Sequence, residues 1–332
     1  MLVVALLSAA CDATGDTADR RPGPSSTSTT TPSTSRAAGR DRIPTGEPGD
    51  ATIHEPGWST PIRLAVNDDG WEDSPYLSRD GSRLIFFHHP YPDLITATEQ
   101  ITAEIVADPE RAVAKGLDGR IYVSNRPFET KSVHPISSDG SPAAECCPYE
   151  TTDGRLFYAS TRESWERGEG VPESIYLDGE RLNVWAGPDE SNPHYVEALD
   201  ELWFDCPGDI DICIMRDAAA SDWRGEVVKA PFPVNSRDSE RVEDAIPFLT
   251  DDGRTLYITS DRDTPGKIAI YRLRRLDEAG EQWSEPELFV SADTPVAELS
   301  MTEDGTEMVF SQIFWRDDGT PGIDIYYSRR NG

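Results

Sequence analysis

One segment recurs along most of this chain, and recurrence of this kind constrains the fold more than any single motif. Each copy places an aspartate-glycine turn, or its remnant, a few residues after a proline, and a run of β-branched and aromatic residues follows. Aspartate-glycine between two such runs is a strong hairpin signal. The copies lie at Pro75 and Asp80-Gly81, Pro148 and Asp153-Gly154, Pro193 and Asp200, and Pro247 and Asp252-Gly253, with a fifth, lacking the proline, from Leu299 to Asp304-Gly305.

Each copy predicts four strands. The proline lies in the first, the second follows the turn, the third is a short apolar run, and the fourth carries tryptophan and proline, most clearly from Trp283 to Val290. Several repeats of four strands are typical of a β-propeller. The predicted second strands are 84–87, 156–158, 202–204, 256–258 and 308–310, and the predicted third strands are 121–123, 174–177, 212–215, 268–271 and 323–327.

The last repeat ends after its third strand, so its fourth strand must come from elsewhere in the chain. The segment from Trp58 to Val66 resembles the segment from Trp283 to Val290 and precedes the first repeat. We therefore expect it to close the ring as the outer strand of the last blade. The prediction is an all-β chain with a single β-propeller of five blades of four strands, six blades being the alternative. An insertion at residues 90–116 is left over, and residues 97–113 within it predict a helix.

Two further features recur: Ser-x-Arg, at Ser160-Thr-Arg162 and Ser260-Asp-Arg262, and an Ile-Tyr pair in the third strand. With the proline, the turn and the apolar pair, they make the repeat similar to the WD40-like repeat of TolB-type β-propellers over residues 58–330. The resemblance implies the fold. It implies little about function, because this repeat serves colicin-handling periplasmic proteins, peptidase lids and uncharacterised lipoproteins. TolB itself has six blades and an extra N-terminal domain, so we infer no role in the Tol system.

The N-terminal sequence predicts that the protein is exported from the cytoplasm. Residues 1–10 are apolar and end in small residues before Cys11, a pattern that resembles a bacterial lipobox, although Ser8 replaces the usual leucine and no basic residue precedes the run. In lipoproteins this cysteine is lipidated, so Cys11 is the expected membrane anchor. We predict a signal peptide and lipidation site at 1–11, a disordered Ser/Thr/Pro-rich tether at 12–50, and a propeller domain at 51–332, lipid-anchored to the bacterial cell membrane.

The charge balance excludes one class of function. The chain has 61 acidic and 31 basic residues, a formal net charge of -30. General nucleic-acid binders need basic residues for phosphate contacts, so nucleic acid is not an expected partner. Self-repulsion at this charge favours a monomer. After the first dozen residues no apolar run approaches the roughly 18 to 20 residues of a membrane-spanning helix, so only the N-terminal lipid is expected to contact the membrane.

Repeated acids predict a site at one end of the propeller channel. In the first four repeats an acid lies three positions before the proline, whereas the fifth has Val296 there and Glu298 displaced. Loops that open on the same face carry further polar and aromatic groups. Such a ring suits a polyol, a sugar or a metal ion, although repetition also fits a structural role in pairing with the Ser-x-Arg arginine. The expected partner at this acidic face is a carbohydrate or an envelope protein. The candidate ligand-binding residues are Glu72, Glu145, Glu190, Asp244, His88, Arg162, Arg262 and Trp315.

A glycoside hydrolase is the alternative function. Some five-bladed propellers are furanosidase-like enzymes that place two carboxylates across the scissile bond. Here Glu72 or Asp73 is the candidate base, and Glu145 or Glu190 the candidate acid with a raised pKa. This is analogy of fold alone, since the sequence lacks that clan's motifs. Gly-rich phosphate loops, Gly-x-Ser-x-Gly and His-Glu-x-x-His are likewise absent from the sequence.

We expect no cofactor, with Ca²⁺ as a weaker possibility. Adjacent His88 and His89 point to opposite faces of a strand, so only one of them could ligate a metal ion, and no second imidazole lies at a chelating spacing. His89, which precedes Pro90, is expected in a turn. The acidic loops Asn67-Asp68-Asp69-Gly70 and Asp209-Ile-Asp211 offer oxygen ligands, but neither has the spacing of an EF-hand, and a solvated turn is the default interpretation.

Four cysteines remain after the anchor, and an even number in an exported chain indicates disulfides, with three possible connectivities. Cys206 and Cys213 bracket a hairpin loop and are the favoured pair, which leaves Cys146 and Cys147 for a bridge between adjacent residues. Alternatively, Cys146 or Cys147 pairs with Cys206, or the thiols stay free.

Overall fold

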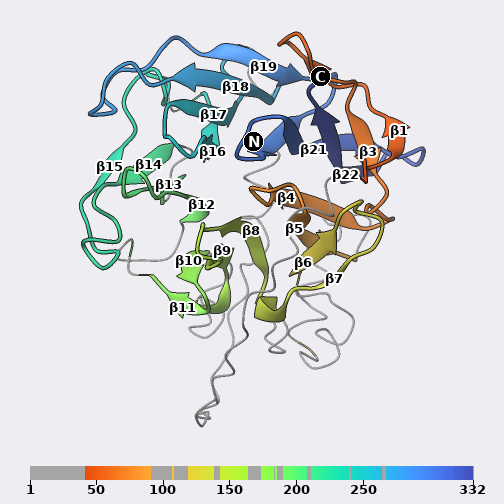
Figure 1. Ribbon diagram of the computed structural model, residues 1–332, viewed down its shortest axis with the longest axis horizontal. Helices are drawn as coiled ribbons and strands as arrows, with labels where there is room; N and C mark the ends of the chain where they lie inside the picture. Colours follow the sequence, from red (N-terminus) through yellow and green to blue (C-terminus); the bar gives the residue numbers. More distant parts are fainter. Residues whose placement is uncertain are drawn as a thin grey trace.

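The structure is a computed structural model, in which five sheets surround a central axis (Figure 1). Cys11, most of the tether and most of the 90–116 insertion lie outside the described residues, so the predictions made for them stay predictions. Among the described residues, no helix is both long and apolar enough to cross a membrane. The structure describes residues 42–90, 107, 119–137, 143–163, 173–182, 184, 190–207, 211–238, 241–263 and 267–331.

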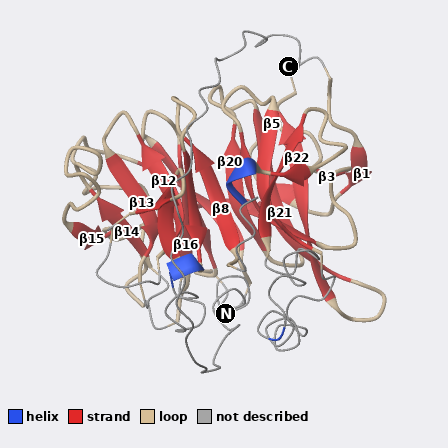
Figure 2. Cartoon of the chain, turned by 90° about the horizontal axis from the view of Figure 1, so that it is seen from below, coloured by secondary structure: helices blue, strands red, loops and turns tan. Residues whose placement is uncertain are grey.

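Each sheet is one blade, built as the repeat predicts, and strands dominate the side view (Figure 2). The innermost strands are β4 (Trp71–Leu77), β8 (Glu145–Glu150), β12 (Ser191–Val196), β16 (Asp244–Leu249) and β20 (Val296–Met301). The second strands are β5 (Arg83–His89), β9 (Leu156–Ser160), β13 (Glu201–Asp205), β17 (Thr255–Ser260) and β21 (Glu307–Trp315). The third strands are β6 (Arg120–Asn125), β10 (Ser174–Leu177), β14 (Ile212–Met215), β18 (Ala269–Arg274) and β22 (Pro321–Arg329).

The outer strands confirm how the ring closes. They are β7 (Ser132–Val133), β11 (Glu180–Arg181), β15 (Val227–Lys229), β19 (Glu287–Ser291) and, for the last blade, β3 (Ile62–Leu64). Strand β3 pairs antiparallel with β22, with Arg63 opposite Tyr326. The N-terminal segment thus supplies the missing strand, and the propeller has five blades.

Two short strands extend the outer edges. Strand β1 (Gly46–Pro48) pairs with β3, and β2 (Thr52–Ile53) pairs with β19. Strand β1 lies within the stretch that the sequence assigned to the tether, so the propeller begins before residue 51. A three-residue 3₁₀ helix, η1 (Pro135–Ser137), precedes β8.

Blades pack face to face through buried apolar side chains. In β5 six of the seven residues are buried, including Phe86 and Phe87. A strand covered on both faces loses the alternation of apolar and polar residues, which explains the continuous apolar runs of the second strands. Leu64 of β3 is fully buried, so the closing strand contributes to the core as well as to the sheet.

Every innermost strand carries the same irregularity. The register of each shifts by a β-bulge at the residue before the repeat proline, or before Leu299 in the last blade. That residue has a positive φ in all five blades, an uncommon conformation for a non-glycine residue that indicates local strain. These bulge residues are Ser74 (φ 49°), Cys147 (57°), Asn192 (51°), Ile246 (56°) and Glu298 (60°).

The structure confirms one of the two disulfides that the sequence favoured. Cys206 and Cys213 form a disulfide across the β13–β14 hairpin, as expected. The expected bridge between Cys146 and Cys147 is wrong, because both are free, buried thiols. Cys146 stays in the antiparallel ladder opposite Ala159, whereas Cys147 is the bulge residue with a positive φ, and the two thiols lie side by side without a bond between them.

Candidate functional site

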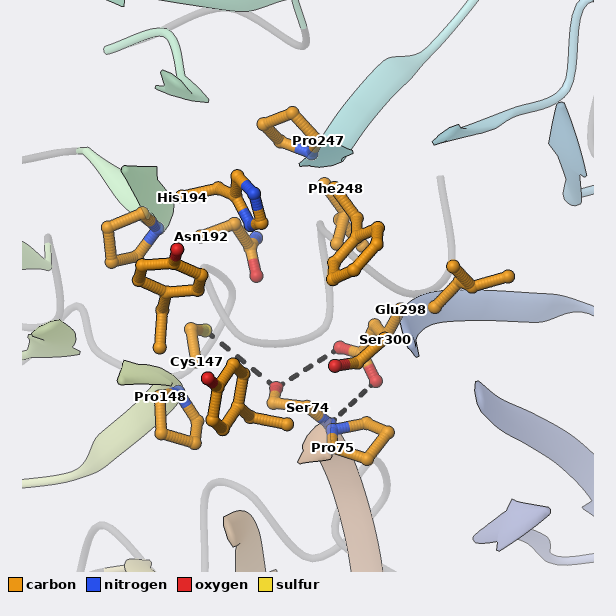
Figure 3. A pocket seen from close by; sticks show the side chains of 15 residues that line it. Ser74, Pro75, Cys147, Pro148, Asn192, His194, Pro247, Phe248, Glu298 and Ser300 are labelled. Carbon is orange, nitrogen blue, oxygen red and sulfur yellow. Dashed lines mark hydrogen bonds between the residues drawn. The ribbon is translucent and has the colours of Figure 1, made fainter. Parts of the chain in front are cut away.

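The five bulges surround a small cavity on the propeller axis (Figure 3). Each blade contributes three consecutive residues: the bulge residue, the residue after it, which is proline in four blades, and the next residue. The cavity measures about 50 Å³. One water needs about 10–15 Å³ by this kind of measure, so the cavity has room for a few waters or an ion and none for a sugar ring.

Aromatic rings surround the axis just beyond the bulges. Tyr76, Tyr149, His194 and Phe248 come from four successive blades, and their neighbouring ring centroids lie 4.4–5.4 Å apart. Ser300 occupies the fifth position. Burial lowers the pKa of His194 to about 3, so its ring is neutral and bonds the Leu249 backbone. Close aromatic packing makes this part of the channel a rigid wall.

A larger cavity lies at the end of the channel where the innermost strands stop and the Asp-Gly turns begin, which we call the turn face. It measures about 170 Å³, and Tyr149 and His194 line both this cavity and the axial cavity. A cavity of about 150 Å³ holds one benzene ring, so this one accommodates a single six-membered ring. Its lining is Arg79, Tyr149, Thr152, His194, Tyr195, Val196, Glu197, Ala198, Thr250 and Asp251.

Charged groups hold the mouth of this turn-face cavity in place. Arg79 forms an ion pair with Asp251 and lies 3.6 Å from the carboxylate of Glu303. The backbone N–H of Thr152 donates a 2.5 Å hydrogen bond to Glu197 of the next blade. Burial raises the pKa of Asp251, against the opposing effect of Arg79. The cavity therefore presents both donors and acceptors, with carboxylates in excess.

The predicted acids begin the innermost strands at the opposite end, which we call the acid face. Glu145 accepts a 2.6 Å hydrogen bond from Arg162, and Asp244 a 2.5 Å bond from Arg262. Asp244 also accepts from Ser260. Both arginines belong to the Ser-x-Arg pattern, and both pairs lie within one blade. These four residues come together as the sequence suggested, in ion pairs between a buried carboxylate and a partly buried arginine of the same blade.

In the first blade, Glu72 is fully buried and lies 2.9 Å from Nδ1 of His88. The Lys131 ammonium bonds Glu72, lies 3.2 Å from Nδ1 of His88, and pairs with Asp68 at 2.8 Å. Asp68, Glu72 and His88 have ligand atoms close enough to hold a metal ion. A lysine cation already lies among these three side chains, so the site has little need of a metal.

Glu190 differs from the other acids of the ring. It is fully buried and forms an ion pair with Arg181 at 3.9 Å, and among the described residues neither carboxylate oxygen has a hydrogen-bond partner. Burial raises its pKa to about 8, against the opposing effect of Arg181. Glu190 is therefore largely protonated at neutral pH, as expected for a candidate acid.

Asp73 is buried on the axis rather than open to a substrate. Its carboxylate accepts a 2.7 Å hydrogen bond from the Trp71 indole and a 3.1 Å bond from the Ser74 hydroxyl. Burial, and then the nearby Glu298, raise its pKa well above the usual value. Glu298, displaced from the acid ring in sequence, is itself a bulge residue lining the axial cavity.

The remaining predicted residues are scattered. Trp315 ends β21 with 57% of its surface exposed, whereas His89 is buried. Asn67 of the first acidic loop bonds the backbone of Leu64 and Ile325, which is a structural role. In the second loop Asp209 lies outside the described residues, and Asp211 pairs with Lys229 at 2.7 Å.

Sequence reasoning missed the turn-face residues. Arg79, Thr152, Thr250 and Asp251 lie in or next to the turns that served only to mark the repeat, and Glu197 occupies the equivalent place in a repeat whose turn is a remnant. Variation between the repeats could have revealed these residues, because the residues in the turns differ from blade to blade while the surrounding pattern repeats.

Comparisons with known proteins identify no family for this chain. No known protein family matches the sequence, and no curated protein matches it. A solved protein of unknown function from Dyadobacter fermentans is similar over 83% of this chain and 100% of its own, with a TM-score of 0.46 and 11% identity. A thermostable family-43 glycoside hydrolase is similar over 79% of this chain and 93% of its own, with a TM-score of 0.49 and 10% identity. A gluconolactonase from Xanthomonas campestris is similar over 87% of this chain and 97% of its own, with a TM-score of 0.45 and 11% identity. The TolB-type resemblance stays a prediction.

Proposed function

We propose that the chain is a lipid-anchored, extracytoplasmic propeller that binds one uncharged sugar unit of a carbohydrate in the turn-face cavity. The lipid anchor rests on the sequence around Cys11, and the ligand rests on the cavity. The single observation that supports the ligand class is a ring-sized space lined by tyrosines, threonines and charges of both signs. Pockets of this kind fix a ligand through a few placed polar groups among apolar walls.

The lining matches the chemistry of a sugar. Aromatic side chains pack against the C–H face of a pyranose, and Tyr149 and Tyr195 belong to the lining of the cavity. Sugar hydroxyls both donate and accept hydrogen bonds, so a guanidinium beside carboxylates can satisfy them from both sides. The carboxylates of Glu197 and Asp251 outnumber the single guanidinium of Arg79, which disfavours acidic sugars such as uronates.

The contacts of the predicted catalytic carboxylates favour binding over hydrolysis. A hydrolase of this fold needs two carboxyl groups facing one bond. Glu190, with its pKa raised to about 8, supplies one plausible acid. Glu72, Glu145 and Asp244, however, each contact a cationic side chain within the fold. The second carboxylate of a hydrolase therefore has no candidate among them.

The test is calorimetric titration of the full chain with neutral monosaccharides and short oligosaccharides, with uronic acids as the charged comparison. Arg79→Gln and Asp251→Asn each remove a charged hydrogen-bonding group worth about 1.5–3 kcal/mol, so each is expected to weaken binding about 10- to 100-fold. The matched controls are Arg224→Gln and Asp222→Asn, which change an exposed arginine-aspartate pair 3.7 Å apart in another loop.

Saturable binding of a neutral sugar that both cavity variants weaken, and both controls leave intact, supports the proposal. Binding that survives both cavity variants, or that prefers uronic acids, overturns the assigned cavity. Release of reducing sugar during the same titration would establish the hydrolase instead.

A further inference from the structure

Three ligand groups for a soft metal meet in the second blade, away from the turn-face cavity. The Sγ atoms of Cys146 and Cys147 and a carboxylate oxygen of Glu173 all lie within 4.8 Å of one another. Cys146 Sγ lies 3.4 Å from Glu173 Oε1. The two cysteines belong to β8, and Glu173 directly precedes β10 of the same blade. Strands β8 and β10 belong to one sheet, on either side of β9, so a single blade holds all three groups.

The spacing fits a bound metal ion. Tetrahedral zinc sites place thiolate sulfur about 2.3 Å and carboxylate oxygen about 2.0–2.2 Å from the metal, which puts sulfur and oxygen about 3.5 Å apart. The 3.4 Å between Cys146 and Glu173 agrees with this separation. Two thiols and one carboxylate make a donor set that selects zinc-like ions over calcium or magnesium.

The surroundings also favour a cation. Asp73 of the first blade and Glu298 of the last blade are both buried, and the Ser74 hydroxyl, which lies 3.7 Å from Cys147 Sγ, bonds both carboxylates.

Within the described part of the chain, no arginine or lysine forms an ion pair with Asp73, Glu298 or either thiol. The contrast is with Asp68, Glu72 and His88, where Lys131 already provides the positive charge.

A fourth ligand position has space. Cys147 lines the axial cavity, and its sulfur lies 3.7 Å from the Ser74 hydroxyl, which in turn bonds Glu298 (Figure 3). The cavity of about 50 Å³ has room for water beside an ion.

We propose that Cys146, Cys147 and Glu173 bind a thiophilic divalent cation of the Zn²⁺ type, with a water from the axial cavity as the fourth ligand. Binding breaks two S–H bonds, forms two metal–sulfur bonds and releases two protons to solvent, with no change in oxidation state. The site is separate from the sugar cavity, so loss of either function leaves the other intact.

Cobalt provides the direct test, because thiolate ligands give Co²⁺ a near-ultraviolet charge-transfer band and tetrahedral geometry gives it strong visible bands. We expect the reduced, metal-stripped full chain, kept without oxygen, to bind one equivalent of Co²⁺ with both signals, and Zn²⁺ to displace it. Affinity should rise with pH, and titration in buffers of different ionisation enthalpy should show about two protons released per metal.

Substituting each proposed ligand in turn tests whether it binds the metal ion. Cys146→Ser and Cys147→Ser should each weaken Co²⁺ binding by more than about 100-fold and diminish the charge-transfer band, and Glu173→Gln should weaken binding at least about 10-fold. The controls are Glu180→Gln, an exposed glutamate in the same blade, and Cys206→Ser/Cys213→Ser, which removes the disulfide pair. Both should keep the wild-type band.

If a serine variant fails to fold, the wild-type chain still gives an answer, because bound Zn²⁺ should slow maleimide labelling of Cys146 and Cys147, read by mass spectrometry. The proposal is overturned by a wild-type chain without a thiolate band, by a band that survives both serine variants, or by Ca²⁺ displacing Co²⁺ as well as Zn²⁺ does.

Discussion

The backbone N–H of Ser74 donates a 2.7 Å hydrogen bond to Oε2 of Glu298, which joins the first blade to the last at the axis. The Ser311 hydroxyl bonds the same carboxylate, and the Ser74 hydroxyl bonds its other oxygen at 3.2 Å. Strand β3 closes the ring at its outer edge, and Glu298 closes it at its centre. The bulge displaces Ser74 from the strand ladder, so its N–H needs this acceptor.

Replacing Glu298 by alanine should therefore destabilise the propeller. The buried N–H of Ser74 would lose its acceptor, which costs about 1–3 kcal/mol of unfolding free energy, whereas Glu298→Gln keeps an oxygen acceptor and should recover part of the loss. Urea unfolding measures the difference. The control is Glu303→Ala, because that side chain is 64% exposed in the same blade. Equal stability of the two alanine variants would contradict the role assigned to Glu298.

The outer closure makes its own prediction. Leu64 of β3 is fully buried, and truncating a buried leucine costs about 2–5 kcal/mol. We expect Leu64→Ala to lower the urea midpoint accordingly, and Ile43→Ala, at a position 47% exposed, to change it little. If Leu64→Ala is harmless, the N-terminal strand does not pack in the last blade as the structure has it.

The fold was predictable because its determinants are local and repeated. Each blade carries its own turn and apolar runs, and the likeness of the Trp58 and Trp283 segments indicated which strand was missing. The Ser-x-Arg pattern also indicated partners for Glu145 and Asp244, because residues at a fixed offset on paired strands meet in every blade.

The sites were not predictable because they depend on packing between distant segments. Nothing in the residue types at Ile246 or Glu298 favours a positive φ, yet both adopt it where five bulges crowd the axis. Lys131 reaches Glu72 across 59 positions of sequence. Arg79 pairs with Asp251 across the channel mouth from a different blade. Contacts of this kind follow from blade geometry, which no short motif encodes.

The disulfide should contribute measurably to stability. Cys206 and Cys213 are seven positions apart, and closing so short a loop in the unfolded chain is expected to contribute about 2–3 kcal/mol by loop entropy. The Cys206→Ser/Cys213→Ser chain should unfold at correspondingly lower urea than the oxidised wild type. Adding reductant should lower the wild-type midpoint by a similar amount and leave the double variant unchanged; if reductant shifts both chains equally, another group is responsible.

Asp205 should make stability depend on pH. Its carboxylate accepts 2.7 Å hydrogen bonds from the Ile246 N–H and from Asn192, yet burial outweighs them and raises its pKa to about 7 from an ordinary value of 3.8. Between these two values the folded chain holds a proton that the unfolded chain has lost. Stability from this group is therefore fully present below pH 4 and is lost as the pH rises towards 7.

Asp205→Asn stays neutral throughout and lacks this dependence. The unfolding free energy of the wild type minus that of Asp205→Asn should fall by up to about 4 kcal/mol between pH 4 and 7 and stay flat above, since each unit of pKa shift is worth about 1.4 kcal/mol. Urea unfolding across this pH range measures the difference, and exposed Asp222→Asn should run parallel to the wild type. If the difference in unfolding free energy is constant with pH, Asp205 is ionised in the folded chain as it is in the unfolded chain. If the difference rises with pH, the hydrogen bonds from Ile246 and Asn192 stabilise the carboxylate more than burial penalises it.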